Sequence, residues 1–227
     1  MHSRATLLSI SILYVCLLTK TSFAAWVSDL DPSIDCKALL AQKTEERSKN
    51  ADLENKITTS NEIDYKMAKS IFDFTVKDTM NAKVPLDDYC RGYVTLVVNI
   101  ASSCGLTENN YAQLTQLDKD FRDKLRVLSF PSNQFGGQMP EGDGDEMLCH
   151  LKSRNAAPGG ILAKIDVNGD NAIPLYKYLK EKLKGEAGPD IEWNFVKFLI
   201  DKNGQPVKRY DKMVEPMAIV EDIKKLF

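Results

Sequence analysis

Two apolar runs and the more polar stretch between them form the clearest hydrophobic pattern in the chain. Tyr93 to Ile100 reads YVTLVVNI and Leu125 to Phe130 reads LRVLSF. Such β-branched runs are typical of central strands covered on both faces. Between them, apolar residues recur at spacings of three to five over residues 107–123, which predicts a helix. Strand, helix and strand in this order predict a right-handed βαβ unit, and therefore parallel strands in an open α/β sheet.

Weaker patterns predict the remaining elements. The alternation from Ile71 to Val76 is typical of a strand with one buried face, and we place the start of the core domain near it. Downstream, the sequence predicts a short helix within 141–154, a helix over 175–183 opened by Pro174, a hairpin over 195–210 turning at Asn203-Gly204, and a closing helix over 216–227.

The first 24 residues have the pattern of a secretory signal peptide. A short cationic start precedes an apolar stretch and a small-residue end, Ser22-Phe23-Ala24. The apolar stretch, of about 14 residues, falls short of the ~20 that span a bilayer, which disfavours the alternative of a membrane anchor. We predict cleavage near Ala24 and a product that is secreted or resides in the lumen of the secretory pathway.

Residues 25–66 differ from the rest of the chain in composition and in hydrophobic pattern. They are rich in charged and polar side chains, and their scattered apolar positions fit a helical period only weakly. We expect an N-terminal extension that is helical or disordered. The predicted domains are therefore the signal peptide (1–24), this extension (25–66) and one α/β domain (67–227).

Charge and hydropathy exclude two classes of partner. The formal net charge of −2 becomes more negative by two when Arg4 and Lys20 leave with the signal peptide. A mildly acidic chain lacks the electrostatic footprint of a nucleic-acid-binding protein. Nothing after the signal peptide is long and apolar enough to predict an integral membrane segment.

Cysteine usage admits two interpretations. Cys16 leaves with the signal peptide, so Cys36, Cys90, Cys104 and Cys149 remain. Four cysteines in a secreted chain would ordinarily be read as two structural disulfides. However, a domain of this size can bury a sufficient core without such crosslinks. A reactive role for one or more of the thiols therefore stays open.

Cys104 is the thiol most suited to chemistry. It follows a predicted central strand and precedes a predicted helix, whose N-terminal dipole favours thiolate over thiol. Gly105 leaves room for a substrate, and Thr107 stands where a C-x-x-C motif would place a second sulfur. The alternative is an inert, buried cysteine.

The scarcity of histidine narrows the reaction that Cys104 can perform. After the signal peptide only His150 remains, whereas a cysteine hydrolase needs a histidine base and a catalytic zinc site needs several ligands. A thiolate without a base suits a substrate whose leaving group is already good. Peroxide is such a substrate, and it oxidises the thiolate to sulfenic acid.

Three segments together carry a family resemblance. NIASSCGLT (99–107), FPSNQFGGQMP (130–140) and WNFVKFLID (193–201) resemble, in order and spacing, the signature blocks of the glutathione peroxidase family. The resemblance covers about Ser70 to Phe227. It implies a thioredoxin-like fold with a central mixed β-sheet flanked by helices, and reduction of hydrogen peroxide and organic or lipid hydroperoxides without a metal or other cofactor.

The same resemblance implies which residues act. Cys104 is the peroxidatic residue, with sulfur where many members have selenocysteine, and its partners match Gln138, Trp193 and Asn194. The amide and indole N–H groups of these partners can stabilise a thiolate and then the alkoxide leaving group.

The reductant depends on a second cysteine. EMLCHLK (146–152) resembles the helix that carries the resolving cysteine in one branch of the family, here Cys149, and that branch is reduced by thioredoxin. Glutathione is the alternative reductant, although the basic residues that favour it cannot be matched here. We expect a reduced enzyme whose Cys104 and Cys149 sulfurs are too far apart to bond, so that a short helix with few buried contacts must partly unwind. A packed, inert Cys149 is the alternative.

The remaining predictions concern other thiols, one turn and assembly. We expect Cys90 to be an exposed, non-catalytic thiol in a turn, and Cys36 to be available for an intermolecular disulfide. DVNGDNA (166–172) lacks the glycine and glutamate positions of an EF-hand and predicts a turn. Residues 183–192 are shorter than the assembly loop of tetrameric relatives, which predicts a monomer.

Two rival functions stay open at this stage. A thiol–disulfide oxidoreductase would need a C-x-x-C pair, which the chain lacks. A non-enzymatic secreted protein that relays oxidation to partner thiols would share Cys104 but would not consume peroxide catalytically.

Overall fold

The computed structural model describes residues 25–49 and 63–227. The predicted signal peptide, residues 1–24, lies outside the described residues. So does the part of the N-terminal extension from residue 50 to residue 62.

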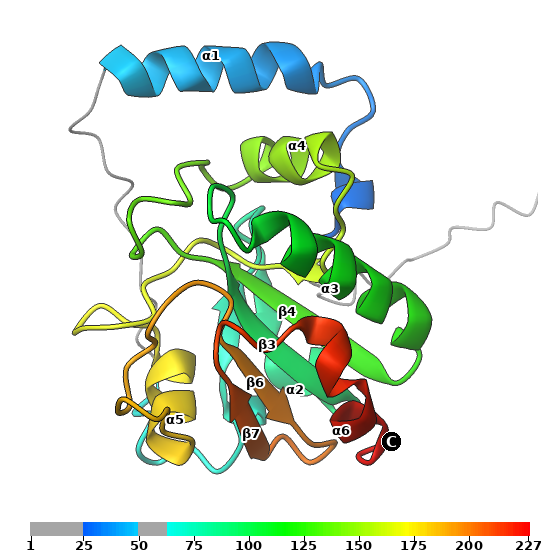
Figure 1. Ribbon diagram of the computed structural model, residues 1–227, viewed down its shortest axis with the longest axis vertical. Coiled ribbons are helices and arrows are strands. Elements are labelled where there is room, and N and C mark those ends of the chain that lie inside the picture. The colour runs from blue at the N-terminus through cyan, green and yellow to red at the C-terminus, as the bar shows by residue number, and fades with distance from the viewer. Residues whose placement is uncertain (1–24, 50–62) are drawn as a thin grey trace, which may run out of the picture.

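A five-stranded mixed sheet forms the centre of the molecule (Figure 1). Its strands, in the spatial order β5-β4-β3-β6-β7, are β3 (Val94–Ile100), β4 (Leu125–Pro131), β5 (Gly160–Ile161), β6 (Lys197–Ile200) and β7 (Pro206–Tyr210). β3 and β5 both run parallel to β4, whereas β6 is antiparallel to β3 and to β7. A separate antiparallel pair consists of β1 (Thr75–Lys77) and β2 (Lys83–Pro85).

Helices lie on both sides of this sheet. They are α1 (Cys36–Lys49), α2 (Leu86–Cys90), α3 (Thr107–Phe121), α4 (Asp145–Ser153), α5 (Pro174–Lys182) and α6 (Val220–Lys224), with 3-10 turns η1 (Val27–Asp29), η2 (Ile71–Asp73) and η3 (Pro216–Ile219). The predicted β3-α3-β4 unit, the helix opened by Pro174 and the β6-β7 hairpin are confirmed. So is the fold class, an α/β domain with a mixed sheet flanked by helices.

The alternation of side chains along β3 divides the core in two. Val94, Leu96 and Val98 face one apolar cluster, which α3, α4 and α6 complete, while Val97 faces another, built with α2 and α5. Every residue of β3 is buried. Because both faces are covered, a side chain that contacts a substrate cannot lie within β3. Cys104 instead follows the carboxyl end of this strand, where the chain leaves the sheet towards α3.

Two sequence predictions are wrong in detail. The stretch from Ile71 begins as the 3-10 turn η2 instead of a strand, because Ser70 and Asp73 form a capping box: Phe72 N–H donates to Ser70 Oγ and Ser70 N–H donates to the Asp73 carboxylate. Cys90 is fully buried at the end of α2, not exposed in a turn. Burial raises the pKa of the Cys90 thiol to about 12, which keeps it protonated and unreactive.

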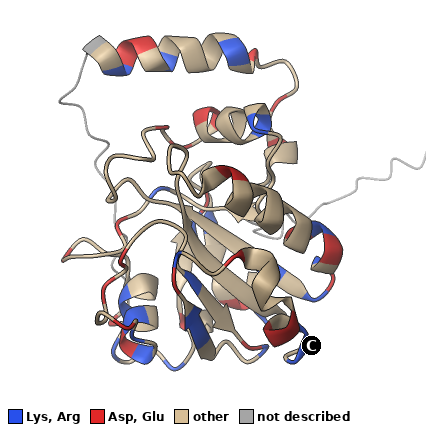
Figure 2. Ribbon diagram, in the orientation of Figure 1, with Lys and Arg blue, Asp and Glu red and all other residues tan. Residues whose placement is uncertain are grey.

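The described part of the N-terminal extension packs against the domain. Ala25 forms a β-bridge with Ile161 of β5, and Leu30 is buried in the cluster that contains α4. α1 then lies beside α4, with Leu39 and Leu40 against the same cluster (Figure 1). α1 carries charges of both signs (Figure 2). Within the described ranges, none of the helices has the length and apolar character needed to span a membrane.

Candidate active site

Cys104 lies in the loop that joins β3 to α3, where it is half-buried and carries a free thiol. Its N–H donates to Thr107 Oγ1 over 3.1 Å, and its carbonyl accepts from Thr107 N–H over 3.0 Å. Thr107 Oγ1 in turn donates to the Ala101 carbonyl over 2.8 Å. Thr107 stands where a C-x-x-C motif would have its second cysteine. Its hydrogen bonds hold both the N–H and the carbonyl group of Cys104 in place.

Gln138 is bonded to the same loop through its backbone. The N–H groups of Ser102 and Ser103 both donate to its carbonyl, over 2.9 and 3.0 Å. Gly136 and Gly137 precede it with φ of 65° and 66°, a left-handed conformation that glycine adopts without strain. These glycines turn the chain so that Gln138 meets the residues immediately before Cys104.

Asn194 joins this arrangement from the segment that leads into β6. Its Nδ2 group donates to Gln138 Oε1 over 2.8 Å, and its side chain is fully buried. Because that bond occupies the oxygen of the Gln138 amide, the Nε2 group of Gln138 remains available as a donor. The other Asn194 amide atom, Oδ1, is buried and has no hydrogen-bond partner among the described residues.

Trp193 lies next to Asn194 and is partly exposed. Its ring contacts that of Phe135, with centroids 5.8 Å apart, and the Lys212 ammonium lies 5.7 Å from its ring centroid. The structure thus connects the loop of Cys104 with Gln138 and Asn194 by hydrogen bonds, and places Trp193 at the adjoining position. These side chains offer amide and indole donors of the kind that stabilise a thiolate or an oxyanion.

Asn99 is a positioning residue that the sequence analysis missed. From within β3, its Nδ2 donates to the Trp193 carbonyl over 3.0 Å, and its Oδ1 accepts from Val196 N–H over 3.0 Å. Its own carbonyl accepts from Phe195 N–H over 2.7 Å, at a residue with φ of 64°. The signal was an amide within a mostly apolar strand, YVTLVVNI.

The DVNGDNA segment is a turn, as predicted, and it supports the site. Gln134 Oε1 accepts from the N–H groups of Val167 and Asn168, over 2.7 and 2.9 Å. Asn168 exchanges two hydrogen bonds with the backbone of Ile191, over 2.8 and 2.9 Å. The turn therefore links the loop of Gln138 to the segment just before Trp193.

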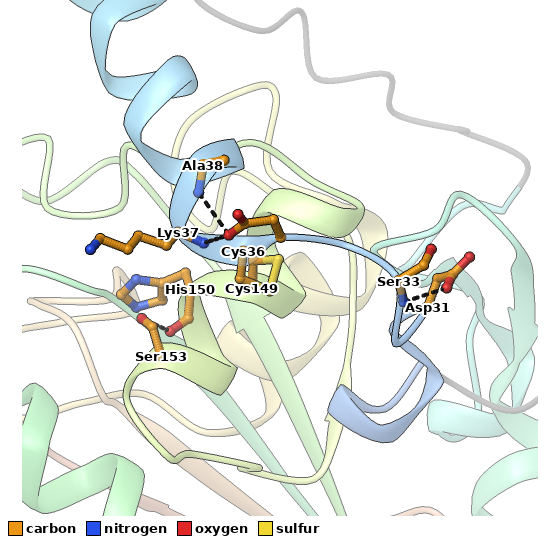
Figure 3. Close-up of a disulfide and its surroundings, with 9 residues drawn as sticks. Asp31, Ser33, Cys36, Lys37, Ala38, Cys149, His150 and Ser153 are labelled. Atoms are coloured by element: carbon orange, nitrogen blue, oxygen red, sulfur yellow. Dashed lines mark hydrogen bonds between the residues drawn. A yellow bond between two sulfur atoms is a disulfide. The ribbon is translucent and has the colours of Figure 1, made fainter.

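Cys149 is bonded to Cys36 of the N-terminal extension, with Cα atoms 5.1 Å apart (Figure 3). Cys36 is the first residue of α1 and is half-buried, whereas the Cys149 side chain is completely buried in α4. We expected Cys36 to be available for an intermolecular disulfide. In the structure it is instead bonded to Cys149 of the same chain. Cys104 is not bonded to Cys149 here.

The prediction that α4 has few buried contacts is wrong. Its central residues, Met147 to Leu151, are all buried, because α4 packs on an apolar cluster of the sheet and also contacts α1 and η1. Opening α4 therefore requires loss of packing as well as of helix hydrogen bonds.

The His150 side chain of α4 contacts the segment before α4 and helix α3. Its Nδ1 lies 3.3 Å from Glu141 Oε1, and its ring meets that of Tyr111 edge-on at 6.2 Å. Burial lowers the pKa of His150, while the Glu141 carboxylate opposes this change. The lowered pKa favours the neutral form of the imidazole.

Comparison with known proteins gives concordant matches. The family model described as glutathione peroxidase matches residues 71–180, a range that includes Cys104, Gln138 and Cys149 and begins after Cys36. The "Probable phospholipid hydroperoxide glutathione peroxidase" of Nicotiana sylvestris is 49% identical over 159 residues, which are 70% of this chain and 93% of that protein. "Glutathione peroxidase 1" of Helianthus annuus is 46% identical over 70% of this chain and 94% of its own.

Solved structures agree with these matches. The crystal structure of Trgpx in apo form is 37% identical, with a TM-score of 0.57 over 70% of this chain and 95% of that one. T. cruzi GPX1 is 34% identical, with the same TM-score over 70% of this chain and 96% of its own. Together with the strand order, these similarities confirm the expected thioredoxin-like fold.

Proposed function

Because the chain belongs to the glutathione peroxidase family of peroxidases, we propose that it reduces hydrogen peroxide and lipid hydroperoxides through Cys104. The observation that carries this proposal is the hydrogen-bonded connection from the Cys104 loop through Gln138 to Asn194. The thiolate attacks the terminal peroxide oxygen, the O–O bond breaks, and the departing alkoxide takes up a proton. Cys104 becomes sulfenic acid, and the peroxide becomes an alcohol or water.

Phospholipid hydroperoxides are the substrate class that the similarity favours. Several relatives carry the name phospholipid hydroperoxide glutathione peroxidase, at 48% to 49% identity. Gly105 and Ser103, on either side of Cys104, are both exposed. Small, exposed neighbours leave room for a bulky peroxide to approach the thiol.

For the reductive half, we favour Cys149 as the resolving residue and thioredoxin as the reductant. The Cys104 sulfenic acid condenses with the Cys149 thiol, which releases water and forms a disulfide that a dithiol can reduce. The participation of Cys149 in a disulfide in this structure supports its use as a redox-active thiol. Glutathione, acting directly on Cys104, is the alternative.

A coupled peroxidase assay tests both the reduction of peroxide by Cys104 and the choice of reductant. We expect consumption of hydrogen peroxide and of a phospholipid hydroperoxide with catalytic thioredoxin and its reductase, and little with glutathione. Cys104→Ser should abolish turnover, since a hydroxyl is a far poorer nucleophile, while Cys90→Ser serves as the matched control because Cys90 is buried away from the site. Substantial turnover by Cys104→Ser would overturn the assignment, and turnover with glutathione alone would change the reductant.

A second assay addresses Cys149. We expect Cys149→Ser to keep a near-normal first oxidation by peroxide, to lose thioredoxin-supported turnover and to overoxidise at Cys104. Persisting turnover with thioredoxin would exclude Cys149 as the resolving residue.

We also propose that the chain is exported and monomeric. The pattern of residues 1–24 supports export, and a disulfide within the chain suits an oxidising compartment. N-terminal sequencing of the product from secreting eukaryotic cells should begin at Ala25. An intact Met1 in a cytosolic product would contradict this.

A further inference from the structure

The two cysteines of the Cys36–Cys149 disulfide differ in their exposure to solvent. Cys149 is fully buried in α4, packed in the apolar cluster with Met147, Leu148 and Leu151, whereas Cys36 is half-buried at the start of α1. Thiol–disulfide exchange requires a thiolate to reach one of the sulfurs in line with the bond. An external reductant can therefore reach Cys36 far more readily than Cys149.

We infer that Cys36 is a third redox cysteine of the catalytic cycle, which accepts the disulfide from Cys104–Cys149 and presents it to the external reductant as Cys36–Cys149. This inference rests on the proposed function, in which Cys149 resolves the Cys104 sulfenic acid. It adds a residue that lies outside the range matched by the family model, which begins at residue 71.

The transfer of the disulfide from Cys104–Cys149 to Cys36–Cys149 needs no reactant outside the chain. The Cys36 thiolate attacks Cys149 Sγ, the bond between Cys104 and Cys149 breaks, and the electron pair leaves with Cys104 as thiolate. Cys104 is then ready for another peroxide. An external dithiol of the thioredoxin class attacks Cys36 Sγ, releases the Cys149 thiolate, and carries the disulfide away when its second thiol displaces Cys36.

Contacts other than the disulfide hold Cys36 near Cys149. Upstream, Ile161 N–H donates to the Ala25 carbonyl over 2.8 Å, the Arg122 guanidinium lies 4.4 Å from the centroid of the Trp26 ring, and Leu30 is buried. Downstream, Leu39 and Leu40 pack on the cluster that contains α4. When the disulfide opens, these contacts retain the extension, so that the Cys36 thiol keeps a high effective concentration next to α4.

The first turn of α1, shown in Figure 3, and the far end of the same helix add to this attachment. Asp35 Oδ1 accepts from the N–H groups of Lys37 and Ala38 over 3.0 and 3.1 Å, which fixes the start of the helix at Cys36. In the last turns of α1, Arg47 forms an ion pair with the largely buried Glu146 carboxylate of α4. A thiol at an ordered helix start needs little reorganisation to attack its partner.

Trapping of disulfides after a single oxidation tests the inference. Fully reduced protein is mixed with one equivalent of hydrogen peroxide, quenched with acid at successive times, alkylated and mapped by mass spectrometry. In the wild type we expect a transient Cys104–Cys149 bond that gives way to Cys36–Cys149 with Cys104 free. In Cys36→Ser, Cys104–Cys149 should accumulate, and thioredoxin-supported turnover should fall by about tenfold or more, because the disulfide can no longer pass from Cys104 to the start of α1. Lys37→Ser, at the exposed neighbouring position, should behave as the wild type.

Each other outcome overturns the inference in a recognisable way. If Cys36→Ser accumulates no disulfide beyond the wild type and turns over at the same rate or faster, Cys36–Cys149 is a structural crosslink or an inhibitory lock, and the proposed function stands without it. If the wild type ends at Cys104–Cys149, the transfer does not occur. If neither protein forms Cys104–Cys149 and Cys104 proceeds to sulfinic acid, the resolving role of Cys149 fails, and this inference fails with it.

Discussion

The Asn194 side chain is connected to the Cys104 loop through Gln138. It donates to Gln138 Oε1, and the Gln138 carbonyl receives the N–H groups of Ser102 and Ser103, immediately before Cys104. Replacing Asn194 by a residue without an amide therefore removes a donor from the candidate site. It also removes the hydrogen bond that aligns the Gln138 side chain.

We predict that Asn194→Ala slows oxidation of Cys104 by about 10²-fold, the typical cost of a lost donor at a site of developing negative charge. Stopped-flow mixing of reduced enzyme with excess peroxide measures this rate directly. Asn203→Ala, in the exposed turn of the β6-β7 hairpin, is the matched control and should leave the rate unchanged. An unchanged rate in Asn194→Ala would show that this amide takes no part in the chemistry.

Lys197 is a second residue with a measurable consequence, in this case for stability. It is fully buried in β6, and its Nζ donates to the Val214 carbonyl over 2.6 Å. Burial lowers the pKa of Lys197 from 10.5 to about 8, against the opposing effect of the Asp211 and Glu215 carboxylates. Between these two values the unfolded chain binds more protons than the folded chain. The contribution of Lys197 to the free energy of unfolding is therefore least favourable below pH 8 and rises as the pH rises towards 10.5.

We predict that Lys197→Met loses this rise. Between pH 7.5 and pH 10, the difference in free energy of unfolding between wild type and Lys197→Met should shift in favour of the wild type by about 2 kcal/mol. Urea unfolding at the two pH values measures it, with Lys119→Met, at an exposed position on α3, as the control. Parallel pH profiles for wild type and Lys197→Met would contradict the prediction.

At the scale of elements, α4 depends on the extension that lies beside it. Its five central residues are buried, and Cys149 joins it covalently to α1. A crosslink between two elements removes motions in which one of them opens away from the other. Reduction of the disulfide restores those motions without removing the other contacts of the extension.

We predict that amide hydrogen exchange in α4 is faster in the reduced protein than in the oxidised protein. The reason is that the bond to Cys36 opposes any opening of α4 away from α1. Exchange followed by mass spectrometry on peptides covering 145–153 measures the difference, and α5, which packs in the other core cluster, is the internal control. Equal protection of α4 in both redox states would show that the disulfide does not restrain it.

Local patterns predicted much of this architecture from the sequence. Periodicity located β3, α3 and β4, Pro174 marked the start of α5, and Asn203-Gly204 located the hairpin, because each of these signals acts over a few neighbouring residues. The pairing of Cys36 with Cys149 joins residues 113 positions apart, and nothing in the weak pattern of α1 indicated which surface it would cover. The burial of Cys90 was missed for a similar reason, since acidic neighbours in α2 obscured its apolar face.

The candidate site shows the same division. The motif blocks predicted Cys104, Gln138, Trp193 and Asn194 as site residues, and the structure brings their segments together. The supporting amides of Asn99 and Asn168 were not predicted, because a hydrogen bond between a strand and a distant loop leaves no periodic trace in the sequence.

For the whole molecule, the segment over residues 183–192 bears on assembly. It folds back on the domain, where the Arg209 guanidinium donates to the carbonyls of Leu183, Pro189 and Asp190. These three carbonyls are thus used within the chain, which disfavours their use in a contact with a neighbouring subunit.

We predict a monomer for the chain from residue 25 onward in light scattering at micromolar concentration. Cys36→Ser should give the same mass, which separates a disulfide-linked dimer through a freed Cys36 from association by the folded surface. A stable tetramer of either protein would contradict the prediction.

The bridge between Ala25 and Ile161 has a consequence for solubility. β5 is an outer strand of the sheet, and outer strands with free backbone groups invite another chain to add a strand and start aggregation. Here Ile161 N–H donates to the Ala25 carbonyl, and the Ile161 carbonyl accepts from Thr79 N–H over 3.1 Å. Maturation at Ala24 would leave Ala25 as the first residue of the chain. A cut a few residues further along would remove Ala25 and expose the Ile161 N–H group. The outer strand β5 could then pair with a strand of another chain.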